Sequence, residues 1–127
     1  MRWVRFRHDG TLKIGRLNDD IVVVQSGSMF QNPEPTGEVL EPADVTFLPP
    51  VAPGKIIGLA NNFHALIEKA GGSIPEEPLY FIKVNTSLHQ GGVPITRPKR
   101  YAGKIIFEGE LGLVIGNTCR DVSPEDA

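Results

Sequence analysis

Hydrophobic and polar residues alternate in short runs over the first part of the chain, as expected for β-strands with one buried face. Val4 and Phe6 share one face of the first run, and Asp9 with Gly10 is a typical signal for a two-residue hairpin turn. The runs joined by such tight turns cover residues 2–7, 11–17 and 21–24. This pattern predicts a three-stranded antiparallel meander.

Residues 25–54 are rich in Gly, Ser, Pro and Asn instead. Proline has no N–H to donate and is excluded from helix interiors and central strands. We therefore interpret this stretch as a linker without a long helix or a central strand. The predicted units are a small β module with its linker at residues 1–53 and a second unit at residues 54–127.

The second unit begins with a predicted buried strand at 55–60. Asn61 and Asn62 could cap a following helix at 63–70, which the glycines at 71–72 should end. Apolar, β-prone residues then predict further strands at 79–83 and 107–115.

Glu108 and Glu110 are two residues apart within the last of these strands. Side chains at that spacing leave the same face of a strand. Two neighbouring carboxylates are costly to bury unless a cation neutralises them, so one divalent metal held by both is one interpretation. The alternative is a solvent-exposed pair on an edge strand, and spacing alone leaves both open.

Composition narrows the functional classes. The chain has 127 residues, a net charge of −2 and 40% hydrophobic residues, which is normal for a globular domain. Because basic and acidic residues are mixed along it, we expect neither a nucleic-acid nor a membrane partner. One cysteine and the lack of a long apolar run indicate a cytoplasmic protein.

Five segments in order resemble the fumarylacetoacetate hydrolase family. They cover residues 55–64, 75–83, 86–88, 107–116 and 121–126. The leading β module also resembles the small N-terminal domain of bacterial members, such as 2-hydroxyhepta-2,4-diene-1,7-dioate isomerase. The resemblance therefore covers the whole chain.

The resemblance implies a mixed α+β, mainly β fold, in which the small N-terminal β module precedes the first part of a mixed β-roll. It implies a homodimeric catabolic enzyme that depends on a divalent metal and is a hydrolase or isomerase. The substrate would be a small 2-oxo or diketo acid, and the reaction an isomerisation, a C–C bond hydrolysis or a decarboxylation through a metal-stabilised enolate.

Matched position by position, Glu108 and Glu110 correspond to metal ligands of the family, for Mg²⁺ or for Mn²⁺ or Ca²⁺. Lys83 corresponds to a lysine near the site that could pair with a substrate carboxylate, or it is a surface lysine at a strand end. Ser87 and His89 lie in a loop that often faces the substrate, which makes them candidate substrate contacts.

The catalytic base is harder to assign. The family places a histidine in an Asn-Tyr-x-x-His-x-x-Glu helix, but here Ala65 or Leu66 occupies that position. His64 and Glu68 are four residues apart on one helical face, so they could form a displaced acid–base pair or a solvated pair. Without a base, hydrolysis should suffer more than isomerisation or decarboxylation.

The family also has a third metal ligand, an aspartate on a later strand, whereas this chain ends at Ala127. We therefore expect a truncated chain with an incomplete site that a second copy or a complementing C-terminal segment would complete. Two functions stay open. The first is the N-terminal part of a metal-dependent enzyme, inactive alone, and the second is a catalytically silent assembly module.

Overall fold

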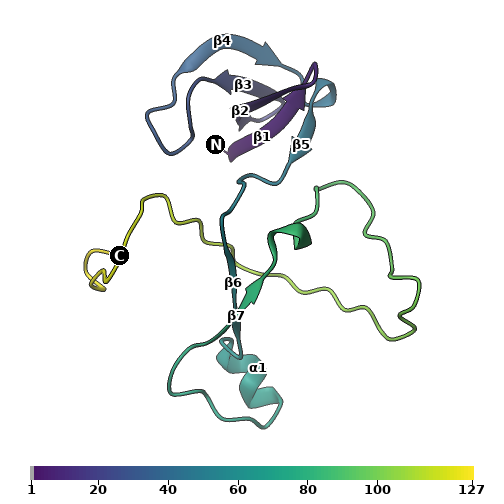
Figure 1. The fold of residues 1–127 in the computed structure, drawn as a ribbon, viewed down its shortest axis with the longest axis vertical. Helices are drawn as coiled ribbons and strands as arrows, with labels where there is room; N and C mark the ends of the chain where they lie inside the picture. Colours follow the sequence, from purple (N-terminus) through teal and green to yellow (C-terminus); the bar gives the residue numbers. More distant parts are fainter. Residues whose placement is uncertain (1) are drawn as a thin grey trace.

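The computed structural model describes residues 2–127 and is mainly β, as the sequence predicts (Figure 1). The chain forms a five-stranded sheet and a two-stranded sheet. The first lies at one end of the molecule, and the second lies with the short helix toward the other end (Figure 1). Residues 84–127 contain one 3₁₀ turn, η2 (Asn85–Ser87), and otherwise run as loops.

The first sheet is antiparallel throughout, with the strand order β4-β3-β2-β1-β5. Its strands are β1 (Arg2–His8), β2 (Thr11–Asn18), β3 (Ile21–Gln25), β4 (Pro35–Leu40) and β5 (Thr46–Leu48). The predicted meander is confirmed as β1 to β3. Asp9 and Gly10 both have positive φ, 48° and 73°, as a tight two-residue hairpin turn requires.

The core of this sheet is small and lies on one face. Phe6 and Val22 are fully buried, and Val24 is nearly so. Gly15 sits beneath the Phe6 ring and beside Val22, because a Cβ at this position would lie 3.1 Å from the ring and 2.9 Å from the valine Cγ1. The absent side chain thus lets β1 and β3 side chains meet over β2.

The interpretation of residues 25–54 as a linker is partly wrong. This stretch contributes β4, the 3₁₀ turn η1 (Pro42–Asp44) and β5 to the first sheet. The prolines are tolerated because β4 and β5 are the edge strands, and Pro35 is the first residue of β4. Pro42 likewise starts η1, where no N–H is needed.

The second sheet is an antiparallel pair, β6 (Ile56–Ala60) and β7 (Leu79–Lys83). The helix α1 (His64–Lys69) lies between them in the chain. The bounds of all three elements are predicted within one or two residues, but β6 is not the buried strand expected, because its residues are half-buried or exposed. Gly71 has a φ of 70°, and the N–H groups of Gly71 and Gly72 bond to the carbonyls of Glu68 and Ile67, which ends the helix in a Schellman motif.

Two local predictions are wrong. Phe63 is the N-cap of α1 and no side chain caps the helix, whereas Asn61 takes a left-handed φ of 51° in the turn out of β6. The predicted strand at 107–115 does not form, because no strand of the described residues pairs with it. A β-strand needs a hydrogen-bonded neighbour, and a cavity separates this segment from β6.

Candidate functional site

An open cavity of about 530 Å³ lies between the carboxyl end of β6, one face of α1 and the segment that holds the two glutamates. Leu66 and Ile67 of the helix and Asn61 and Asn62 of the preceding turn form one side. Residues 108–110 form the other side, so segments distant in sequence meet here.

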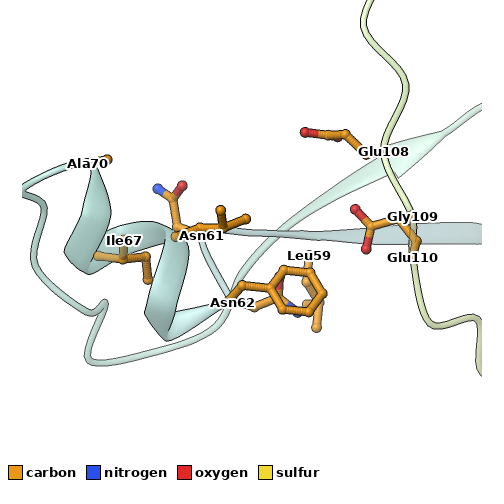
Figure 2. A pocket seen from close by; sticks show the side chains of 10 residues that line it. Leu59, Asn61, Asn62, Ile67, Ala70, Glu108, Gly109 and Glu110 are labelled. Carbon is orange, nitrogen blue, oxygen red and sulfur yellow. The ribbon is translucent and has the colours of Figure 1, made fainter.

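Glu108 and Glu110 extend from their segment toward the same side, where Asn61 and α1 lie (Figure 2). Gly109 between them adds no side chain. The backbone here is not part of a sheet, but alternate residues of an extended chain still point the same way. Both glutamates are exposed, and no cationic side chain of residues 2–127 forms an ion pair with either.

The asparagines reach the cavity because of the turn between β6 and α1. The left-handed φ of Asn61 redirects the chain at the end of β6, a conformation that asparagine tolerates better than most residues. Within residues 2–127 neither amide side chain makes a hydrogen bond to the protein. Both amide oxygens are therefore available to a ligand.

A second cavity, of about 690 Å³, runs along β6, and Glu108 and Glu110 line both cavities. Lys83, at the end of β7, lines this cavity, and so does Lys55, which directly precedes β6. Two ammonium groups and two carboxylates thus border one space. Such a mixture can hold a cation and the anionic ligand that accompanies it.

The other predicted site residues lie apart from these cavities. His64 and Glu68 are exposed and line neither cavity, and no hydrogen bond between them is found within residues 2–127. Ser87 is exposed in η2. The Nε2 atom of His89 lies 3.3 Å from the carbonyl oxygen of Pro94, within the same loop. The roles of all four residues stay predictions.

The available donors are oxygens, which suit a hard divalent cation. Two carboxylates and two amide oxygens border the first cavity. Within the described residues, however, no group of three or more His, Cys, Asp or Glu side chains is close enough to hold a metal ion. The donor set therefore fits such a cation in its chemistry but supplies only part of a coordination shell.

Sequence reasoning missed Asn61, Asn62 and Lys55 as residues of the site. For the asparagines the available signal was their position in the turn directly after a predicted strand, because binding residues are often found in connecting loops. The lysine gave no signal beyond its position beside β6.

No helix within residues 2–127 is long and apolar enough to span a membrane.

Comparison with known proteins gives two family matches. Residues 1–50 match the model described as Rv2993c-like, N-terminal. Residues 55–127, more than half of the chain, match the model described as fumarylacetoacetate (FAA) hydrolase C-terminal.

Individual relatives are similar over part of their length. Protein Rv2993c of Mycobacterium tuberculosis is 37% identical over 77% of this chain and 37% of its own length. The 2,4-didehydro-3-deoxy-L-rhamnonate hydrolase of a Sphingomonas strain is 32% identical over the whole chain and 48% of its own length. The chain thus spans less than half of either relative.

A solved structure has a similar fold. The 5-carboxymethyl-2-hydroxymuconate delta-isomerase of Mycobacterium smegmatis aligns with a TM-score of 0.58 and 27% identity over 68% of this chain and 34% of that one. Together with the match over residues 55–127, this similarity supports the fold and the resemblance read from the sequence. The chain belongs to the fumarylacetoacetate hydrolase family.

Proposed function

We propose that residues 54–127 carry part of a divalent-metal site for a 2-oxo or diketo acid, and that residues 1–53 form an accessory module. The observation that carries the proposal is the orientation of Glu108 and Glu110, whose carboxylates face one cavity and form no ion pair with a cationic side chain of residues 2–127. A divalent cation in this cavity could be held by both carboxylates at once.

In this proposal Glu108 and Glu110 hold Mg²⁺, or Mn²⁺ or Ca²⁺. Asn61 or Asn62 can add an amide oxygen, and water can fill further positions, as is common for Mg²⁺. The remaining protein ligands would come from a second copy of the chain or from a complementing segment. This incomplete shell predicts weak metal affinity for the chain alone.

A divalent cation bound here would supply a Lewis acid that stabilises negative charge on a 2-oxo oxygen. Lys83 attracts the carboxylate of the anionic ligand into the cavity that it shares with the glutamates. His64 with Glu68 remains the candidate acid–base pair, and Ser87 and His89 remain candidate substrate contacts. The reaction class is isomerisation, C–C bond hydrolysis or decarboxylation.

Calorimetric titration with MgCl₂ and MnCl₂ tests the metal site. We expect the wild type to bind at least one of the two ions, and Glu108→Gln and Glu110→Gln each to weaken binding by about tenfold or more. Glu77→Gln is the matched control, because this exposed glutamate lines neither cavity. Equal heats from all four proteins would refute the proposal.

Ultraviolet absorbance of an acylpyruvate and of oxaloacetate, followed with Mg²⁺ in the chain combined with a complementing C-terminal segment, tests the chemistry, because the chain alone is expected to be inactive. Turnover that disappears in Glu108→Gln supports an enzyme. Metal binding without turnover of either compound favours the second candidate instead.

The second candidate is a catalytically silent assembly module that pairs with a homologue or with a separate remainder of the fold. The observation that favours it is the exposure of large apolar side chains in the last third of the chain, such as Phe107 at 96% and Leu111 and Leu113 at 83% each. Exposed apolar surface of this kind usually marks an interface. Native mass spectrometry of the chain from its own cells would show whether it occurs bound to another polypeptide.

A further inference from the structure

Phe81 lies over a gap that Gly58 leaves in the neighbouring strand. The two residues are paired in the β6–β7 register, and a Cβ on Gly58 would lie 2.5 Å from the ring atom Cζ. Any side chain at position 58 would force the ring to shift. The ring therefore rests on the backbone of β6 and occupies the place that any other residue at position 58 would fill.

Lys83 follows Phe81 by two residues and leaves the same face of β7. Its Nζ atom lies 5.6 Å from the centre of the Phe81 ring, within the range of a cation–π interaction. Lys83, Phe81 and Gly58 line the cavity that also contains Glu108 and Glu110.

A ring beneath the ammonium can restrict a flexible side chain such as lysine. Lysine has a flexible four-carbon stem, and fixing it on a bound ligand costs rotamer entropy. A ring beneath the ammonium limits its positions before the ligand arrives, so less freedom is lost on binding. Lys55 lines the same cavity, but no aromatic ring of the described residues lies under its ammonium.

We propose that Phe81, seated on Gly58, is a positioning residue that holds the Lys83 ammonium toward the cavity, ready for the carboxylate of an oxo-acid ligand. This inference rests on the proposed function, because it concerns the ligand of the same site. The inference extends the proposed function by naming Phe81 as the side chain that orients the anion-binding Lys83. It also explains why position 58 is a glycine.

Proton NMR tests the orientation without any metal or ligand. Protons above an aromatic face shift upfield, so the ε-methylene of Lys83 should lie upfield of that of Lys55 in the wild type. The difference should disappear in Phe81→Leu and persist in Phe81→Tyr. It should also disappear in Gly58→Ala if this variant folds. Coincident Lys83 and Lys55 signals in the wild type, or an unchanged signal in Phe81→Leu, would overturn the inference.

Binding of oxalate, a small analogue of an oxo acid, tests the consequence. In calorimetry with Mg²⁺ present, Phe81→Leu should weaken oxalate binding by about two- to fivefold, and Phe81→Tyr should restore it. The affinity for Mg²⁺ alone should not change. Oxalate binding that is weaker in Lys83→Met but normal in Phe81→Leu would refute the positioning role.

The two proposals fail in different ways. If Glu108→Gln leaves the Mg²⁺ binding heat unchanged, the proposed metal site is refuted, independently of any result for the Phe81 variants. If the metal binds as proposed but Lys83→Met binds oxalate normally, Lys83 does not bind the anionic ligand. In that case only the inference about Phe81 is refuted.

Discussion

Phe6 packs its ring over the backbone of Gly15, where an added Cβ would lie 3.1 Å from the ring and 2.9 Å from the carbonyl oxygen of Val23. The carbonyl belongs to the rigid sheet and cannot move aside. We expect Gly15→Ala to lower the free energy of unfolding by about 1–3 kcal/mol.

Urea unfolding followed by the fluorescence of Trp3, the single tryptophan, measures this effect. Trp3 lies in β1 and so reports on the first sheet. Gly54→Ala is the control, because nothing lies within 4 Å of a Cβ at that position. It should change stability by less than about 0.5 kcal/mol. Equal stability of Gly15→Ala and the wild type would show that the packing is looser than described.

Lys13 forms a two-pronged ion pair with Glu38, with Nζ–Oε distances of 2.6 and 2.8 Å. Both side chains are partly exposed, so water screens the pair. A double-mutant cycle of Lys13→Met and Glu38→Gln should give a coupling energy of at most about 1 kcal/mol. Repeating the cycle in 1 M NaCl should reduce this value. A coupling that salt does not change would contradict a screened pair.

Gly71 ends α1 with a left-handed φ of 70°, a conformation that is unfavourable for residues with a side chain. Gly71→Ala should cost about 1 kcal/mol or more locally and loosen the bond from the N–H of Gly72 to the carbonyl of Ile67. Amide hydrogen exchange at residue 72 should therefore become faster. Gly91→Ala, with open space around it, should leave this exchange rate unchanged.

The fold was predictable where local patterns determine it. The alternation around Phe6 and the Asp9–Gly10 turn define the hairpin of β1 and β2, and the glycine at 71 marks the end of α1. Prediction failed for Pro35, because proline is excluded from central strands but not from edge strands, and the sequence does not show which strand lies at an edge.

The site was predictable in part for a similar reason. The spacing of Glu108 and Glu110 gave their common direction, which does not require a sheet. The strand predicted at 107–115 was wrong, because strand formation depends on a neighbour that lies elsewhere in the sequence. The left-handed turn at Asn61 was missed because asparagine is equally typical of helix caps.

The most direct test of the central claim is to locate a bound ion. Mn²⁺ broadens the NMR signals of nearby nuclei, and substoichiometric MnCl₂ should broaden the amide signals of Gly109, Asn61 and Asn62 first. That of Gly10, in the β1–β2 turn, should stay sharp. In a Glu108→Gln, Glu110→Gln double variant the selective broadening should disappear. Broadening that is uniform along the chain, or that is unchanged in the double variant, would contradict a metal site at the glutamate pair.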